Sequence, residues 1–254
     1  MNDDFYIGWE SKAAPSIGRL VRKLVTVVLI AAISLALAFA AAQHTIGVSA
    51  FEWGTLKEFS GVLKLQPYPH LLVPRPGMAG TQPAFSTYYL VAPFKFGLDR
   101  EKLSTLEGRE VSLRGTLIYR GNQTMVEALP DSIKAAGGQP LLSLGAETIR
   151  LGRQTLVGEI VDSKCFLGVM NPGQLLPHRA CAIRCLGGGI PPVLLVRPKA
   201  GPAIYLLLVS AAGRPVNQQV LDLVAEPVQI TGDVERQGDL LILRSDPAGY
   251  QCVR

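Results

Sequence analysis

The sequence lacks the short motifs that identify several common classes of enzyme and cofactor-binding protein. Its four cysteines and three histidines form no Cys-x-x-Cys redox pair and no Cys-x-x-Cys-His haem attachment sequence. There is no Gly-rich phosphate loop, Gly-x-Ser-x-Gly elbow or His-Glu-x-x-His pair. Glu127 and Glu159 have no evident partner, so no acid–base pair is indicated. These absences argue against a c-type cytochrome and favour binding over catalysis.

The chain also lacks any run of lysine or arginine interleaved with aromatic residues. It has 25 basic and 20 acidic residues, and its net charge of +5 is spread along the sequence. Such a distribution predicts no continuous basic surface for phosphate contacts. Nucleic acid is therefore not an expected partner.

One stretch has no charged residue at all. Leu24–Ala42 is 19 residues long, close to the roughly 20 residues that a membrane-spanning helix needs. Four basic residues between Lys12 and Lys23 precede it, and none follows until Lys57. The positive-inside rule then predicts a cytoplasmic tail at 1–23, a transmembrane helix at 24–42 and a periplasmic remainder, held in a bacterial inner membrane.

A cleaved signal peptide is the alternative for this segment, because alanine pairs spaced as at a cleavage site occur at 38–40 and 40–42. The hydrophobic core of a signal peptide usually has only about 7–15 residues, however, and follows a shorter polar lead. We therefore favour an uncleaved anchor. Both interpretations export the rest of the chain.

Beyond the anchor, short predicted strands alternate with glycine and proline, and two regions align with each other. Residues 111–121 match 228–238 at an offset of 117, and residues 59–63 match 156–160 at an offset of 97. Each region contains a predicted hairpin. We interpret the match as an internal duplication of a small domain.

The strand pattern of each copy predicts the fold class. Short antiparallel strands, an interposed helix and glycines within strands are typical of a five-stranded OB-like barrel. The predicted fold is mainly β, with one N-terminal transmembrane helix and two tandem OB-like units at 51–150 and 151–254. A pair of β-sandwich-like modules sharing one sheet is the alternative.

The second unit carries a segment that the first unit does not. Between the first and second strands the offset rises from 97 to about 122, which corresponds to roughly 25 extra residues at 165–189. This segment carries most of the pattern Asp162-x-x-Cys165-x₁₂-His178-x-x-Cys181-x-x-x-Cys185. If 176–186 is helical, the last three of these residues share one helical face. Because the first copy has no cysteine, we expect this cluster to serve something other than closing a barrel.

Thiolates and an imidazole that converge in this way suit zinc or copper. The predicted metal ligands are Cys165, His178, Cys181 and Cys185. Met170 is an additional candidate ligand, particularly for copper. Asp162 is either a further ligand or a hydrogen-bond partner of the histidine.

Two other interpretations of the cysteines remain open. In an exported protein they suit disulfides, with Cys165 bonded to Cys181 or Cys185 and the remaining cysteine bonded to Cys252. Cys181 and Cys185 are poorly placed to bond each other on one helix. The third interpretation is an active thiol, with its thiolate stabilised by the histidine or by Arg184.

The cluster residues belong to a longer pattern, Gly-x-Ile-Val-Asp-x-x-Cys, His-x-x-Cys-Ala-x-x-Cys and Gly-Gly-Ile-Pro, spread over 158–191. This pattern resembles a signature of small exported bacterial proteins, and the resemblance covers about residues 156–243. It implies a cell-envelope location and an OB-like scaffold around a Cys/His site. It implies no particular activity, and Cys252 lies outside it.

Together these features predict a single-pass, membrane-anchored periplasmic protein that binds a transition metal or holds redox thiols and is not itself an enzyme. One alternative is an accessory or assembly subunit of a membrane oxidoreductase or respiratory complex, with the cysteines as structural disulfides. The other is a thiol–disulfide enzyme.

Overall fold

The structure is a computed structural model that describes residues 14–43, 49–75, 85–137, 148–199 and 201–253. It divides into two compact units, Met1–Gly47 and Val48–Arg254. Each unit is described by itself below.

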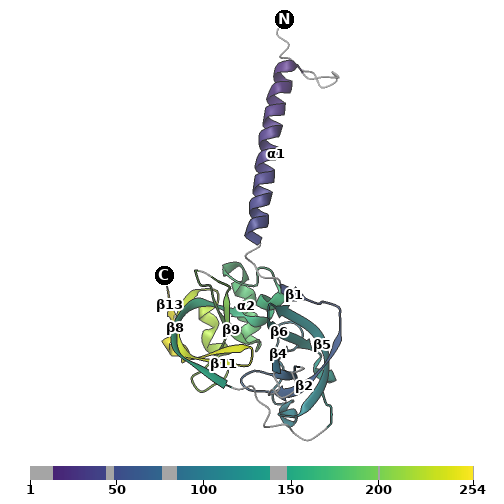
Figure 1. Cartoon of the computed structure of the whole chain (residues 1–254), viewed down its shortest axis with the longest axis vertical. Coiled ribbons are helices and arrows are strands. Elements are labelled where there is room, and N and C mark those ends of the chain that lie inside the picture. Colours follow the sequence, from purple (N-terminus) through teal and green to yellow (C-terminus); the bar gives the residue numbers. More distant parts are fainter. Residues whose placement is uncertain (1–13, 44–48, 76–84, 138–147, 200, 254) are drawn as a thin grey trace. The chain divides into compact units, whose positions relative to one another are not determined.

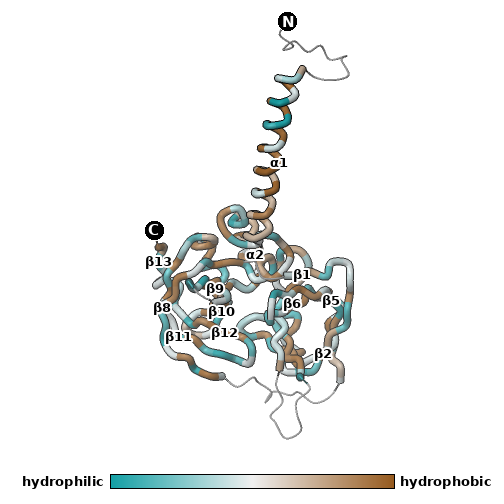
Figure 2. The backbone as a smooth tube through the Cα atoms, turned by 45° about the horizontal axis from the view of Figure 1, so that its top comes forward, coloured by the Kyte–Doolittle hydropathy of each residue, from teal (hydrophilic) through white to brown (hydrophobic). Residues whose placement is uncertain are grey.

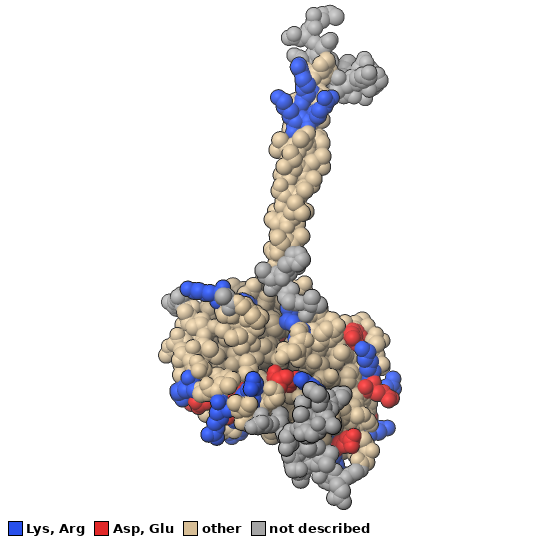
Figure 3. Space-filling view, in the orientation of Figure 1, with Lys and Arg blue, Asp and Glu red and all other residues tan. Residues whose placement is uncertain are grey.

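The first unit contains one helix, α1 (Pro15–Gln43). Within its span Pro15–Ala42, an 18-residue window has a mean hydropathy of 2.7, and none of that window is buried. Figure 2 shows the helix changing from hydrophilic to hydrophobic along its length, and Figure 3 shows basic side chains gathered near its N-terminal end. The helix is compatible with a membrane anchor or a signal sequence. Residues 1–13 of the predicted tail lie outside the described residues, and the helix already begins at Pro15.

The second unit contains two closed five-stranded OB-like barrels (Figure 1). The strands of the first sheet are β1 (Ser49–Phe51), β2 (Lys57–Lys64), β3 (His70–Pro74), β4 (Phe85–Val91), β5 (Glu110–Arg120), β6 (Gln123–Ala128) and β7 (Lys134–Ala135). Its barrel runs β5-β2-β3-β4-β6 and closes on β5. Only the β4–β6 pair of this barrel is parallel.

The second sheet has the same strand order as the first. Its strands are β8 (Thr148–Asp162), β9 (Pro192–Val196), β10 (Ile204–Val209), β11 (Pro227–Gln237), β12 (Leu240–Arg244) and the short edge strand β13 (Gln251–Cys252). The barrel runs β11-β8-β9-β10-β12 and closes on β11, with β10–β12 as its parallel pair. Short 3₁₀ helices at Ser104–Leu106, Pro130–Ser132, Asn217–Leu223 and Pro247–Gly249 complete the two barrels.

The strand registers agree with the offsets found in the sequence. Phe59 pairs with Leu113 in the first barrel, and Leu156 pairs with Ile230 in the second. These four residues are related by the offsets of 97 and 117, so residues that align also occupy equivalent positions. The common origin of the two copies remains an interpretation of that agreement.

Alternating apolar residues supply the cores, as expected for strands with one buried face. Each barrel encloses its own cluster of buried side chains. A third cluster lies between the barrels and takes residues from both, such as Ile118 and Met125 from the first and Leu207 and Ile242 from the second. Its members also include Cys165 and Cys185, so the cysteine-bearing segment packs where the two barrels meet.

That segment connects β8 to β9 through residues 163–191, whereas only residues 65–69 connect the equivalent strands β2 and β3. It contains a π-helical turn at Cys165–Val169, a 3₁₀ turn at Leu176–His178 and the helix α2 (Arg179–Gly187). The predicted helix at 176–186 is therefore present, with a 3₁₀ first turn.

Candidate metal and thiol centre

The site begins at the C-terminal end of strand β8. Asp162 is its last residue and is fully buried. Its Oδ1 accepts a hydrogen bond from the backbone N–H of Cys165 at 2.8 Å. Arg120 of the first barrel donates from Nε to the carbonyl oxygen of Phe166 at 2.7 Å. The turn that carries Cys165 is thus held from both barrels.

Helix α2 presents the other cluster residues. His178 is its N-cap residue, and Cys181 and Cys185 lie one turn apart on it. Gly188 caps the C-terminus of the helix, and its backbone N–H donates to the Arg184 carbonyl at 3.0 Å. Gly189 then adopts a φ of 99°, which favours glycine and turns the chain toward β9.

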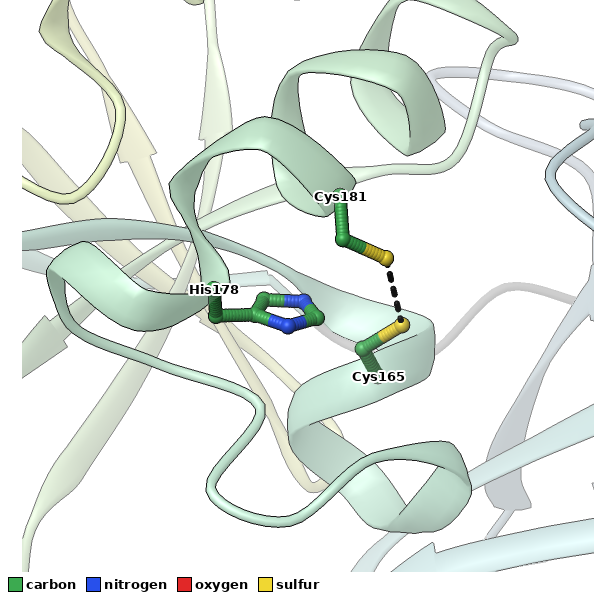
Figure 4. Close-up of side chains that lie close together, drawn as sticks. All are labelled: Cys165, His178 and Cys181. Atoms are coloured by element: carbon green, nitrogen blue, oxygen red, sulfur yellow. Dashed lines mark hydrogen bonds between the residues drawn. The ribbon is translucent and has the colours of Figure 1, made fainter.

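The side chains of Cys165, His178 and Cys181 converge (Figure 4). One ligand atom from each of the three lies within 4.8 Å of the other two. The Cys165 and Cys181 sulfurs are 4.0 Å apart. Two thiolates bound to one zinc ion at about 2.3 Å in tetrahedral geometry would be roughly 3.8 Å apart, so this spacing suits a shared metal ion. The group could hold a metal.

A second group consists of Asp162, Cys165 and Cys185, whose ligand atoms also lie within 4.8 Å of one another. Asp162 is already engaged, however, because its Oδ2 lies 2.8 Å from Nε2 of His178 while Oδ1 holds the Cys165 backbone. A carboxylate that accepts the Nε2 proton leaves the Nδ1 lone pair of the imidazole available for a metal. Asp162 is thus a hydrogen-bond partner of His178 and also a member of a group that could hold a metal.

The thiols of Cys165 and Cys185 lie close enough to alter each other's pKa. A hydrogen bond to Cys185, together with burial, raises the pKa of the Cys165 thiol. The same hydrogen bond lowers the pKa of the Cys185 thiol. The two thiols therefore favour opposite protonation states.

No sequence pattern indicated the cation that contacts the thiols, because this cation comes from the other barrel. Lys95, in the loop after β4, donates from Nζ to the Cys181 sulfur at 2.7 Å and lies 3.8 Å from the Cys185 sulfur. The bond to Cys181 raises the pKa of Lys95, so its ammonium stays charged. Arg184, the cation considered from the sequence, is exposed on α2.

A lysine from the second barrel in turn holds the loop that carries Lys95. Lys164 is almost fully buried and donates from Nζ to the carbonyl oxygens of Ala92 at 3.0 Å and Phe94 at 2.6 Å. Phe94 has a φ of 62°, an unfavourable conformation for a residue with a Cβ. The loop also meets the end of α2, where the backbone N–H of Gly97 donates to the Gly188 carbonyl at 2.9 Å.

Both carboxylates without an evident partner in the sequence form ion pairs. Glu127 on β6 pairs with Lys164. Glu159 on β8 is 3.1 Å from the Arg197 guanidinium and accepts from the backbone N–H of Leu175. These contacts fix the connection between β8 and α2, so both carboxylates have structural roles.

Two further sulfur-bearing residues, Met170 and Cys252, are more exposed than the cluster. Met170 follows the Cys165–Val169 turn and is 45% exposed. Cys252 is exposed on β13, where it pairs with Val228 of β11. The cysteines are free thiols in this structure, and the Cys165–Cys181 sulfur distance is about twice the 2.05 Å of a disulfide.

Comparison of the chain with protein-family models and with curated proteins found no match. The chemistry of the site is therefore argued from its geometry.

Proposed function

We propose that this chain is a single-pass membrane protein that binds one zinc or copper ion through Cys165, His178 and Cys181, with Cys185 beside them as a further thiol. The observation that carries the proposal is the convergence of three ligand atoms within 4.8 Å. The proposal comprises binding only and assigns no catalytic step to the chain.

The hydrogen bond between Asp162 and His178 favours a metal over disulfides. A carboxylate that fixes a histidine ring and its tautomer is the usual support of a metal-bound imidazole. Disulfide bonding within the cluster would require neither His178 nor this bond. Three neighbouring thiols also favour a soft metal ion, because a single disulfide would use only two of them.

The proposed location is the bacterial inner membrane, with the barrels in the periplasm. Its support is the basic residues at the start of α1, which favour a cytoplasmic N-terminus. The likeness of the Cys/His pattern to exported bacterial proteins points to the same compartment.

The proposal is tested by metal analysis of the full chain in detergent micelles. The protein is purified in parallel with and without a thiol reductant. We expect one metal ion per chain in the reduced protein. Intact mass after alkylation should show the cluster thiols protected and Cys252 modified. Cys165→Ser should abolish binding, and Cys252→Ser should leave it unchanged. Absence of stoichiometric metal in both preparations would exclude the proposal.

An accessory subunit of a membrane oxidoreductase complex is a second candidate. The observation that favours it is a pair of exposed aromatic side chains, Phe94 and Phe96, on either side of Lys95. They are 79% and 59% exposed, and exposed aromatic residues are enriched at protein interfaces. Affinity purification of the detergent-solubilised chain distinguishes the two, since a lone monomer argues against an accessory role.

A further inference from the structure

The contact between Lys95 and Cys181 bears on which metal ion the cluster would hold. The ammonium lies 2.7 Å from the sulfur of one proposed ligand. A lysine ammonium has three donors and no lone pair, so it contributes positive charge to the site without acting as a ligand. The same side chain is 3.8 Å from the Cys185 sulfur, so it lies against two of the three thiols.

We propose that Lys95 shifts the selectivity of the cluster toward Cu(I) and away from Zn(II). This inference rests on the proposed metal-binding function, since it concerns the same ligands. It makes the first barrel, which carries no cysteine, the part of the chain that selects the metal.

The first argument is charge. Two thiolates and a neutral imidazole around Cu(I) carry one net negative charge, which the ammonium compensates. The same ligands around Zn(II) are neutral, so the ammonium adds uncompensated positive charge. At equal separation the ammonium repels a divalent ion twice as strongly as a monovalent one. Asp162 and Cys185 contribute the same charge to both complexes, so this difference does not depend on them.

The second argument is the kind and number of ligands. Cys165, His178 and Cys181 form a group of three with two sulfurs, and thiolate ligands select soft ions such as Cu(I). Structural zinc sites almost always have four ligands in tetrahedral geometry. Asp162 holds His178 and the Cys165 backbone N–H through its two oxygens, so recruiting it as a fourth ligand would compete with those hydrogen bonds.

The test compares Cu(I) and Zn(II) affinities of the full chain in detergent micelles, under anaerobic reducing conditions. Bathocuproine disulfonate competes for Cu(I), and 4-(2-pyridylazo)resorcinol competes for Zn(II). In Lys95→Met, which keeps length but removes charge, we expect the ratio of Cu(I) to Zn(II) affinity to fall by about tenfold, since the charge of this half-buried side chain is only partly screened.

Two further variants keep the result interpretable. Lys95→Arg retains the charge and should retain the wild-type ratio. Lys102→Met removes a lysine that is 83% exposed and paired only with Asp99 at 3.7 Å, and it should also leave the ratio unchanged. Circular dichroism of each variant checks that the barrels remain folded.

The outcomes separate this inference from the proposed function. If the wild-type chain binds neither metal, the proposed function fails, and the inference fails with it. The wild-type chain could bind metal while Lys95→Met keeps the wild-type ratio of affinities, or while Lys95→Arg shows a lower ratio. Either result overturns only the role of Lys95. A lower ratio in Lys95→Met, with wild-type ratios in the other two variants, supports the inference.

Discussion

Lys164 and Glu127 form a buried ion pair that joins the two barrels. Lys164 directly precedes Cys165, and Glu127 lies on β6 of the cysteine-free barrel. Lys95 makes the opposite crossing, from the first barrel to the thiols of the second. Each barrel thus contributes one lysine to the other, and together the two lysines fix the loop after β4 against the cluster.

Removing one partner of this pair should destabilise the protein strongly. The Lys164 and Glu127 side chains are 1% and 13% exposed, and an unpaired buried charge typically costs about 3–5 kcal/mol. We expect Lys164→Met to lower the free energy of unfolding by about that much. Adding Glu127→Gln should recover part of the loss, because no charge is then left unpaired, although the carbonyls of Ala92 and Phe94 still lose their donor. Denaturant titrations of both variants measure this. Additive losses in the double variant would contradict the assignment.

Gly188 and Gly187 form a matched pair for testing the contact between the loop and α2. A Cβ on Gly188 would lie 2.0 Å from the Lys95 carbonyl oxygen, whereas a Cβ on Gly187 meets nothing within 4 Å. We expect Gly188→Ala to destabilise the fold by about 1–3 kcal/mol and, by displacing Lys95, to lower the ratio of Cu(I) to Zn(II) affinity. Gly187→Ala should be neutral or stabilising by up to about 1 kcal/mol. Melting temperatures and metal titrations compare them, and equal effects would contradict this account.

Asp162→Asn tests whether the carboxylate orients His178. We expect metal affinity to fall by about 10–100-fold, the usual cost of losing an outer partner of a metal-bound histidine. Asp233→Asn is the control, because Asp233 is 61% exposed and its nearest cation, on Arg153, is 4.0 Å away. Chelator competition measures both affinities. Wild-type affinity in Asp162→Asn would assign the residue a purely structural role.

His70 should make the fold less stable in acid. Burial lowers its pKa from 6.5 to about 4 in the folded chain. Between these two pH values the unfolded chain binds a proton that the folded chain does not bind. The free energy of unfolding should therefore fall as pH decreases from about 6.5 to about 4, by at most about 1.4 kcal/mol per pH unit from this group. Denaturant titrations across this range should show a shallower dependence for His70→Gln. Identical slopes would contradict the assignment.

Local sequence patterns predicted most of the fold, because apolar alternation and glycine positions determine strands and hairpins within short stretches. The two alignment offsets also predicted which residues occupy equivalent positions. Phe59 pairs with Leu113 in the first barrel, and their counterparts Leu156 and Ile230 pair in the second. The bend of the chain at Cys165–Val169 was not predicted, since a π-helical turn has no simple periodic signal.

Part of the site could not be read from the sequence for a physical reason. The spacing within α2 brings His178, Cys181 and Cys185 to one face, and this is a local property of a helix. Lys95 and Lys164 act across the junction of two barrels, at positions far apart in the chain. No sequence pattern marks either lysine, because its partner depends on how the barrels pack.

The core that lies between the barrels also affects how the protein unfolds. Ile118 and Met125 share this core with Leu207 and Ile242, so opening one barrel would expose apolar surface on the other. Residues 49–253 should therefore unfold as one cooperative unit with a single calorimetric transition. A damaging substitution in the cysteine-free barrel would then also reduce the population of chains whose thiol cluster is assembled.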